Sequence, residues 1–227
     1  MRAGYRACLI LCKTIWSTFF RLEISGLENV PPEGQGVLLA SNHQSYLDPV
    51  SIGIPLGREI DFVARQSLFR FRLFGQLLTY LNTLPIQRAS ADVGALRECI
   101  RRLELGQALV LFPEATRTRD GSIGKINPGF ALIAKTAGVP IVPVFTDGAF
   151  QCWPRHRKLP RPGKISVTYG RPISPAEQEG LRPREIAVVL GKRIKKLQRD
   201  STRRRGRIVP VYESPKPTTE PAVLRAP

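Results

Sequence analysis

Short apolar runs recur along the middle of this chain and are separated by polar or helix-like stretches. Runs of four or five apolar residues bounded by Gly, Pro and polar residues are typical of strands. Their alternation with helical patterns predicts an α/β fold, in which a single, largely parallel sheet is flanked by helices. The predicted strands are Val37–Ser41, Ile60–Ala64, Leu84–Gln87, Ala108–Phe112, Ile141–Phe145 and Ile165–Tyr169.

Three stretches show the spacing of an amphipathic helix, with apolar residues every three or four positions. Asp92–Leu105 ends before Gly106, and Gly129–Ala137 ends before Gly138, as helices commonly do. The third stretch, Pro183–Gln198, carries a proline in its first turn, where a missing N–H is tolerated.

The N-terminal residues 1–21 predict an amphipathic helix that associates with a membrane. The apolar run Ala7–Phe20 holds only 14 residues and includes Lys13, so it falls short of the roughly 20 needed to cross a bilayer. At 100° per residue, one face carries Cys8, Leu11, Cys12, Ile15 and Phe19, and the other carries Arg2, Arg6 and Lys13. An interfacial helix and a helix packed on the protein's own core both fit this pattern. Basic residues near Trp16, Phe19 and Phe20 favour the membrane surface.

Length and composition predict one main domain with additional terminal segments. The chain has 227 residues, of which 42% are hydrophobic, which suffices for a substantial core. We therefore divide it into the helix at 1–21, an α/β domain at 22–200 and a basic tail at 201–227. Five prolines in the last 20 residues predict that the tail is disordered.

The charge of the chain implies an anionic partner. Lys and Arg number 35 against 18 Asp and Glu, giving a net charge of +17. Phospholipid head groups, nucleic acid and a phosphorylated substrate all fit such a surplus. A non-enzymatic basic module for membrane or nucleic acid is therefore one hypothesis. Nucleic acid is not expected, because the aromatic residues, 7% of the chain, are not interleaved with the basic runs.

The cysteines and the basic run near the C-terminus predict where in the cell the protein acts. None of the four cysteines forms a Cys-x-x-Cys pair, which is typical of a reduced, cytosol-facing compartment. Residues 192–207 hold nine basic side chains, and each gains about 1 kcal/mol near an anionic membrane surface. We expect a peripheral or monotopic protein on the cytoplasmic face of a membrane.

One of the chain's two histidines lies where proton transfer chemistry is expected. His43 follows the predicted strand Val37–Ser41 and precedes Asp48-Pro49, which is typical of a strand-to-helix turn. Open α/β sheets bind ligands at the carboxyl ends of strands. His43 would act as a general base, and Asp48 would fix its tautomer.

This segment also fits three other interpretations. A structural His–Asp hydrogen bond is the simplest. A serine nucleophile at Ser41 or Ser45 lacks the Gly-x-Ser-x-Gly turn that usually presents one. Metal binding lacks a cluster of ligands at zinc spacing.

A second polar group follows the predicted strand Ala108–Phe112. The residues after it include Arg117 and Arg119, whose guanidinium groups suit a phosphate. Arg88 follows another predicted strand, so all three arginines fall at one sheet edge with His43. This combination predicts a site for a phosphorylated substrate that bears a hydroxyl.

These segments resemble the glycerolipid acyltransferases, the family that includes 1-acyl-sn-glycerol-3-phosphate acyltransferase. The run Asn42-His43-x-Ser45-x-x-Asp48 resembles its first signature, and Phe112-Pro113-Glu114-Ala115-Thr116-Arg117-Thr118 its third block. Ile86-Gln87-Arg88 is similar to the second block, and Val139–Val144 to the fourth. The resemblance covers about Leu22 to Ile173.

The resemblance implies a reaction. A fatty acyl group would pass from an acyl thioester, acyl-CoA or acyl carrier protein, to the free hydroxyl of a lysophospholipid. The acceptor implied first is 1-acyl-sn-glycerol-3-phosphate, which gives phosphatidic acid. The hydroxyl would attack the thioester directly, and no cofactor or metal would be needed. His43 and Asp48 would be catalytic, and the acceptor would be held by Arg88, Glu114, Ala115, Thr116, Arg117 and Lys125.

Ala115 departs from the family pattern, which usually has glycine there, and Thr118 replaces serine. If φ is positive at Ala115, alanine costs about 1 kcal/mol or shifts the loop. Its methyl group would also crowd an acceptor pocket. Another lysophospholipid or an amino-acid-derived lipid is therefore an alternative acceptor.

Overall fold

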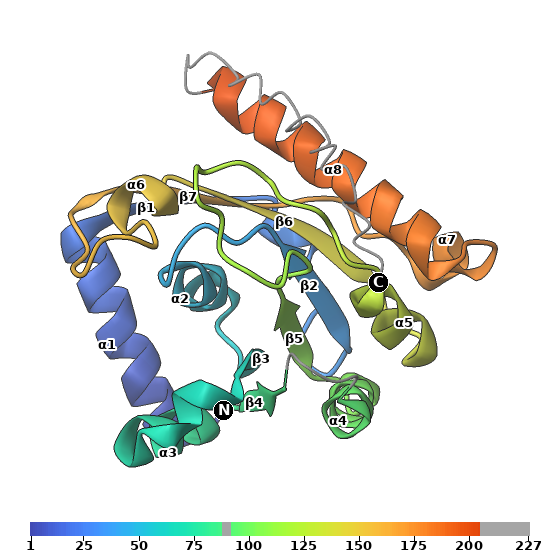
Figure 1. Cartoon of the computed structure of the whole chain (residues 1–227), viewed down its shortest axis with the longest axis horizontal. Helices are drawn as coiled ribbons and strands as arrows, with labels where there is room; N and C mark the ends of the chain where they lie inside the picture. The colour runs from blue at the N-terminus through green and yellow to red at the C-terminus, as the bar shows by residue number, and fades with distance from the viewer. Residues whose placement is uncertain (88–91, 205–227) are drawn as a thin grey trace, which may run out of the picture.

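One seven-stranded sheet forms the centre of the computed structural model, which describes residues 1–87 and 92–204 (Figure 1). The strands lie in the order β1-β7-β6-β2-β5-β3-β4. They are β1 (Phe20–Ser25), β2 (Val37–Ser41), β3 (Ile60–Arg65), β4 (Thr83–Ile86), β5 (Ala108–Leu111), β6 (Ile141–Asp147) and β7 (Gly163–Tyr169).

The sheet is largely parallel, as predicted. Strands β6, β2, β5, β3 and β4 all run in one direction, so their carboxyl ends share an edge. The pair β1 and β7 is parallel within itself, and β7 joins β6 antiparallel. Strand β1 was not predicted, because the apolar run of the N-terminal helix continues into it without a turn signal.

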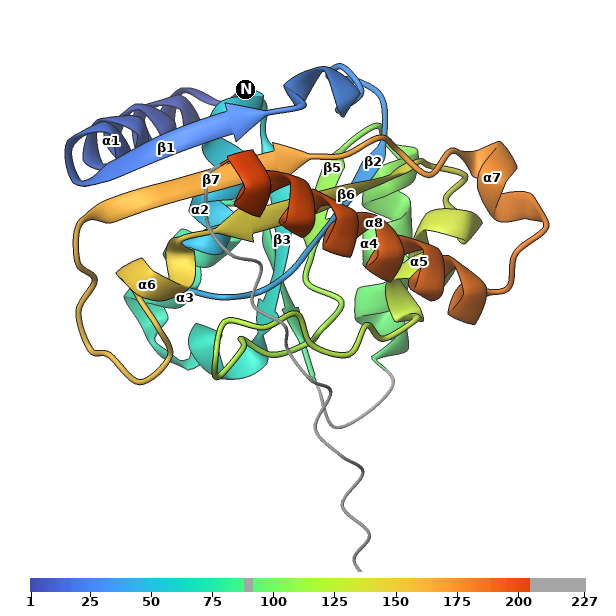
Figure 2. The ribbon, with the colours of Figure 1, turned by 90° about the horizontal axis from the view of Figure 1, so that it is seen from above.

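Helices cover both faces of the sheet (Figure 2). They are α1 (Ala3–Phe19), α2 (Asp48–Gly53), α3 (Arg72–Tyr80), α4 (Val93–Glu104), α5 (Gly129–Thr136), α6 (Ala149–Cys152), α7 (Pro175–Glu179) and α8 (Pro183–Arg204). Three short 3-10 helices are Leu27–Asn29, Ile54–Leu56 and Gln66–Arg70.

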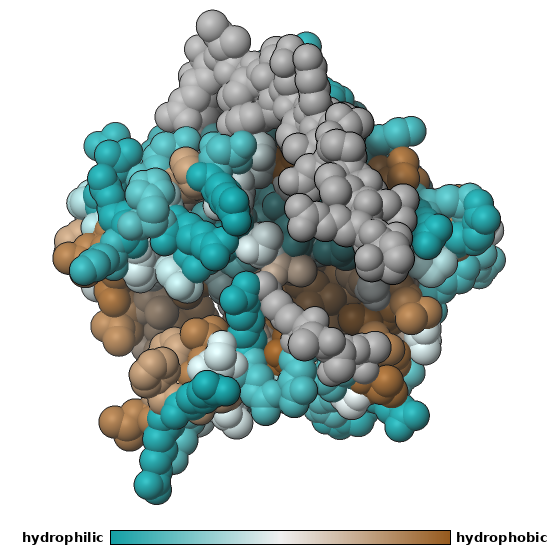
Figure 3. All heavy atoms as spheres, viewed as in Figure 1, coloured by the Kyte–Doolittle hydropathy of each residue, from teal (hydrophilic) through white to brown (hydrophobic). Residues whose placement is uncertain are grey.

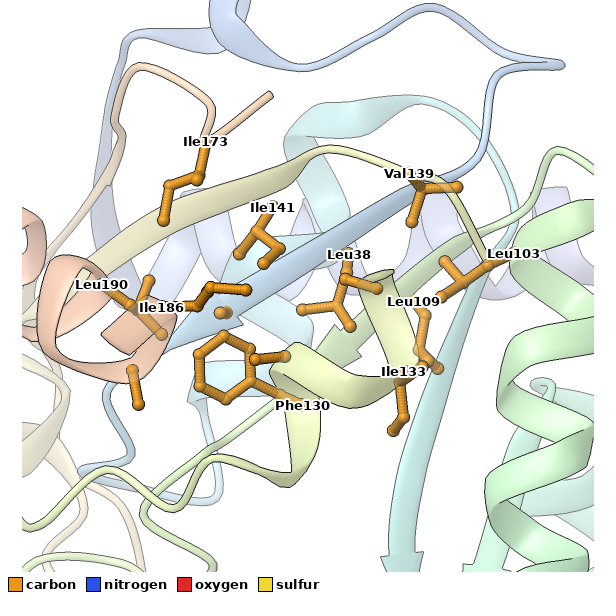
Figure 4. Close-up of a cluster of buried hydrophobic side chains, with 14 of the residues drawn as sticks. Leu38, Leu103, Leu109, Phe130, Ile133, Val139, Ile141, Ile173, Ile186 and Leu190 are labelled. Atoms are coloured by element: carbon orange, nitrogen blue, oxygen red, sulfur yellow. The ribbon is translucent and has the colours of Figure 1, made fainter. Parts of the chain in front are cut away.

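Strand β2 is buried on both faces, because its alternate side chains enter different cores. Leu38 and Ala40 face α4, α5 and α8, where Phe130 and Ile186 fill the space (Figure 4). Val37 and Leu39 join the opposite core, which contains Ile52 of α2 and Tyr169 of β7. This double burial fixes the point at which β2 ends and the polar segment begins.

Helix α1 packs one side on the domain and leaves the other exposed. Tyr5 and Trp16 are buried, and the Trp16 indole N–H donates a hydrogen bond to Ser51 Oγ of α2 at 2.9 Å. The predicted helix is present, but Trp16 and Phe20 lie in the core and not on an outer face, because α2 and β7 pack over them. Its exposed large apolar residues are Ile10, Leu11, Ile15 and Phe19.

Across residues 1–87 and 92–204, no helix has both the length and the apolar character that a bilayer-spanning segment requires.

Helix α8 is longer than its pattern predicted and continues to Arg204. Residues 201–204, assigned to the tail from sequence, are therefore helical, and Ser201 and Thr202 are buried. The pattern did not extend the helix because Asp200-Ser201-Thr202 interrupts the apolar spacing. The remainder of the predicted tail, 205–227, lies outside the described residues.

Candidate functional site

The carboxyl ends of β2 and β5 bring together the two polar segments that the sequence singled out. Residues 42–48 follow β2, and residues 112–128 follow β5, its parallel neighbour. A backbone hydrogen bond ties the segments, since the Thr118 N–H donates to the His43 carbonyl at 2.8 Å. The predicted meeting of the two segments at one sheet edge is therefore present.

His43 and Asp48 are in direct contact. His43 Nδ1 lies 2.9 Å from Asp48 Oδ2. The imidazole side chain is 17% exposed, whereas the carboxylate is fully buried. A carboxylate at Nδ1 holds the proton on that nitrogen and leaves the Nε2 lone pair available as a base.

The Asp48 carboxylate is held by the turn that it belongs to. The backbone N–H groups of Gln44 and Ser45 donate to the same oxygen, Oδ2, at 2.6 and 2.7 Å. Helix α2 begins at Asp48 itself, with Pro49 in its first turn. A negative charge at a helix N-terminus is stabilised by the free N–H groups there. The five-residue spacing thus closes a compact loop around the carboxylate.

Phe112 sets the orientation of the imidazole. The two rings stack with centroids 4.0 Å apart and an angle of 19° between their planes. With Asp48 on one edge and Phe112 on one face, the ring of His43 has little rotational freedom. In this geometry Nε2, the other nitrogen of the ring, is able to accept a proton.

Glu114 is built into the backbone of the site. Its Oε1 accepts the His43 N–H at 3.0 Å, and its Oε2 accepts the Gly124 N–H at 2.9 Å. The side chain joins the two segments and also connects two parts of the segment 112–128. Burial raises its pKa to about 7; the two N–H donors oppose this rise, and the charge of Asp48 adds to it.

Ala115 has the backbone conformation that makes the departure from glycine costly. Its φ is 56°, in the left-handed region, where a Cβ crowds the carbonyl oxygen. The side chain is exposed at the edge beside Glu114. The Ala115 N–H donates to the Phe112 carbonyl at 2.9 Å, and Glu114, the preceding residue, accepts two backbone hydrogen bonds.

Arg117 lies over the ring of Tyr46. Its guanidinium carbon is 3.5 Å from the ring centroid, a close cation–π contact. The Tyr46 ring in turn lies 5.2 Å from the ring of Trp153. Arg117 Nη1 is buried and has no hydrogen-bond partner within the described part of the chain. The side chain as a whole is half-buried, and a guanidinium group suits an anion such as phosphate.

The other predicted substrate-binding residues are less constrained. Thr116 and Lys125 are exposed, and no hydrogen bond or ion pair fixes the Lys125 ammonium among the described residues. Lys125 follows Gly124, which contacts Glu114, so it lies in the same loop. Arg119 is exposed. Arg88 lies outside the described residues.

Sequence reasoning did not assign a role to two residues of this edge. The Asn42 amide donates to the Thr146 carbonyl at 2.9 Å and accepts the Thr146 N–H at 2.8 Å, which joins the ends of β2 and β6. Tyr46 positions Arg117. Both lie inside the first motif, which was the only signal that pointed to them. Within residues 1–87 and 92–204, no group of three or more potential metal ligands is present.

Known acyltransferases are similar to this chain in sequence. A family model described as Acyltransferase matches residues 21–147. A chloroplastic 1-acyl-sn-glycerol-3-phosphate acyltransferase of Arabidopsis thaliana is 29% identical over 158 residues, covering 68% of this chain and 44% of its own. Proteins of the same name from Pseudomonas aeruginosa and Bacillus subtilis are 33% and 26% identical. These two matches cover 74% and 86% of this chain, and 63% and 96% of theirs.

The chain spans less than half the length of the plant relative named above. The crystal structure of a 1-acyl-sn-glycerophosphate acyltransferase from Thermotoga maritima has the same fold, with a TM-score of 0.73. The two chains are 24% identical, and the match covers 86% of this chain and 79% of that one.

Proposed function

This chain belongs to the glycerolipid acyltransferase family, and from that premise we propose that it transfers a fatty acyl group from an acyl thioester to a lysophospholipid. The acceptor we propose is 1-acyl-sn-glycerol-3-phosphate, and the product is phosphatidic acid. The observation that carries the proposal is the His43–Asp48 contact of 2.9 Å at the sheet edge that also holds Arg117. The names of the relatives support this choice of acceptor.

The reaction needs one base. His43 Nε2 takes the proton of the acceptor hydroxyl as the oxygen attacks the thioester carbonyl. The buried carboxylate of Asp48 stabilises the imidazolium that forms. When the tetrahedral intermediate collapses, the carbon–sulfur bond breaks and the proton on His43 passes to the thiolate. An ester and a free thiol result, and no covalent enzyme intermediate is required.

Arg117 binds the phosphate of the acceptor in this scheme, together with Arg88. The guanidinium of Arg117 supplies the donors, and Tyr46 holds it in place. Thr116 and Lys125 are assigned to the rim of the same pocket. Glu114 takes a different part, because both of its oxygens are engaged by backbone N–H groups. We assign it to positioning the His43 loop and not to contact with the head group.

The thioester carrier is acyl-CoA or acyl carrier protein, and it serves as a co-substrate in place of any resident cofactor. The net charge of +17 suits both carriers, which are anionic. We place the protein at the cytoplasmic face of an anionic membrane, peripheral or monotopic. The exposed apolar residues of α1 and the four free cysteines support that placement.

A second acceptor class rests on the departure from the family pattern at Ala115. Its methyl group is exposed in the loop after β5, where the family usually has glycine. Another lysophospholipid or an amino-acid-derived lipid with a differently shaped head group is the second candidate.

The test is acyl transfer to a panel of lysolipids, with acyl-CoA and acyl carrier protein as donors. His43→Ala should lower the rate by a factor of about 10² to 10⁴, the usual contribution of a general base. His156→Ala is the matched control, because His156 is the other histidine of the chain and is exposed. Full activity in His43→Ala would refute the mechanism. If the wild type prefers another lysolipid, that lipid and not lysophosphatidate is the acceptor.

A further inference from the structure

Helix α3 is short, and most of its large apolar side chains are exposed to solvent. Of its nine residues only Gly75 is buried, while Leu78 is half-buried. We call its exposed large apolar residues, with the aromatic residue preceding the helix, the α3 patch. The patch consists of Phe71 (71% exposed), Leu73 (83%), Phe74 (46%), Leu77 (47%) and Tyr80 (41%). A contiguous apolar surface of this kind marks an interaction site.

The patch is held outward by the way that α3 packs. Gly75 lies so close to the preceding 3-10 helix that a Cβ there would stand 2.8 Å from the Phe69 carbonyl oxygen. The helix therefore contacts its support through its smallest residue. Leu73, Phe74 and Leu77 are left exposed, whereas the Tyr80 ring lies against Arg2 at the start of α1. In the space-filling view, apolar side chains gather at the lower left, the region that α1 and α3 occupy in the ribbon (Figures 1 and 3).

The N-terminus of α1 is fixed to the end of α3. The Arg2 guanidinium donates to the Tyr80 carbonyl at 2.8 Å, lies 5.0 Å from the Tyr80 ring centroid and forms an ion pair with Glu59 at 2.9 Å. Helix α1 also exposes Ile10 and Leu11, so both of the helices joined by this contact carry exposed apolar residues.

The charges on α3 and on the segment before it are positive, and Glu59, near the end of α3, is ion-paired with Arg2. Arg65, Arg70 and Arg72 are exposed, and the sequence has no Asp or Glu from Phe62 to Gln87. A groove of about 730 Å³, lined by Arg65, Arg70 and Gln87 among others, lies at the carboxyl ends of β3 and β4. That is the sheet edge on which His43 lies. Basic residues that flank aromatic and aliphatic ones are the composition of an interfacial membrane helix.

We propose that α3 is a membrane-docking element: the α3 patch inserts into the interface of an anionic phospholipid bilayer, and Arg65, Arg70 and Arg72 contact lipid phosphates. The sequence pattern pointed to the N-terminal helix alone. Docking through α3 brings the basic groove and the catalytic edge to the lipid surface, where a lysolipid acceptor resides. The inference rests on the proposed function for its purpose, but lipid binding is measured without acyl transfer.

The first experiment measures binding of the full chain to sedimented vesicles of phosphatidylcholine alone and of phosphatidylcholine with phosphatidylglycerol. Phe71→Gln combined with Leu73→Gln should weaken binding to the anionic vesicles by about tenfold or more, as loss of two inserted side chains predicts. Arg70→Gln with Arg72→Gln should weaken it by about 5- to 30-fold, and only on anionic vesicles. The matched controls are Val188→Gln and Arg184→Gln, both exposed on α8, and should bind as the wild type does.

The second experiment tests insertion directly. Lipids brominated along the acyl chain should quench the tryptophan fluorescence of Leu73→Trp more strongly than that of the wild type. The fluorescence of Val188→Trp should show no such additional quenching. Thermal unfolding and sedimentation of each variant without lipid check fold and oligomeric state.

Three results would overturn the proposal. Wild-type binding by the Phe71/Leu73 variant would show that α3 does not dock. Equal binding to zwitterionic and anionic vesicles would remove the role of the arginines. A lipid-free dimer that the Phe71/Leu73 variant converts to a monomer would make the patch an interface between copies. Failure of acyl transfer, with lipid binding intact, would count against the proposed reaction alone.

Discussion

The guanidinium carbon of Arg117 lies 3.5 Å from the centroid of the Tyr46 ring, so a residue of the first motif positions a residue of the third. A cation–π contact contributes about 0.5 to 2 kcal/mol, depending on how far it is desolvated. Tyr46 itself is half exposed. The contact orients a charge that is otherwise attached only through its own flexible side chain.

Tyr46→Ala should therefore raise KM for a phosphorylated acceptor by about 2- to 30-fold, with a smaller effect on kcat. Tyr46→Phe retains the ring and should behave almost as the wild type. Steady-state kinetics with varied acceptor measures the difference. A selective fall in kcat for Tyr46→Ala would assign Tyr46 to the chemical step instead.

Asp48→Asn removes the charge that stabilises the imidazolium and keeps an oxygen for the two backbone donors. We expect kcat to fall by about 10² to 10⁴, while KM for the acceptor changes little. The loop should keep its fold, because the amide oxygen still accepts the Gln44 and Ser45 N–H groups. A variant that keeps full kcat would mean that the pair is structural.

Ala115→Gly should stabilise the protein by about 1 kcal/mol, because glycine adopts a φ of 56° without a Cβ clash. Urea unfolding measures the change. The matched control is Ala137→Gly at the end of α5, where φ is −77° and glycine should destabilise by about 0.5 to 1 kcal/mol. If both substitutions destabilise equally, the turn at Ala115 is not strained.

The same variant addresses the acceptor. Removal of the methyl group enlarges the rim beside Glu114, so Ala115→Gly should raise activity toward bulkier lysolipids relative to lysophosphatidate. The acceptor panel, run on both proteins with one acyl donor, gives the ratio. An unchanged ratio would show that residue 115 does not contact the acceptor.

Glu114 should make folding stability depend on pH. Its pKa is about 7 in the folded protein, above its usual 4.5, because of burial. Between pH 4.5 and 7 the folded state holds a proton that the unfolded state has lost. The contribution of this group to the free energy of unfolding therefore falls as pH rises through that window, by a few kcal/mol in total, and is constant above it.

Glu114→Gln cannot titrate, so the difference in unfolding free energy between wild type and variant should change with pH between 4.5 and 7 and be level on either side. Chemical denaturation at several pH values provides the curve. The quantity to compare is how the difference changes with pH. Its absolute size also contains the loss of one hydrogen bond, because glutamine has one oxygen where Glu114 has two acceptors for backbone N–H groups. A difference that does not vary with pH would place the pKa of Glu114 near its usual value.

The sequence by itself determined six of the seven strands, the N-terminal helix, the helices α4, α5 and most of α8, and the edge that bears the site. Strand β2 was predicted with its observed bounds, because burial on both faces makes every residue apolar up to Ser41. The contact of His43 with Asp48 also followed from local order, since five residues with a proline-led helix close a small turn. Such features are encoded over a few neighbouring positions, so they can be found without knowledge of the packing.

Only the tertiary structure decided what distant segments do to one another. Two sets of contacts depend on how the loops after β2 and β5 meet. One is the cation–π contact of Arg117 with Tyr46, and the other is the pair of hydrogen bonds that Glu114 accepts from His43 and Gly124. Helix α3 was not predicted, and the exposure of its apolar side chains Leu73, Phe74 and Leu77 is a property of the packing. Periodicity specifies that a face is apolar, but which neighbour covers that face depends on contacts between residues far apart in the chain.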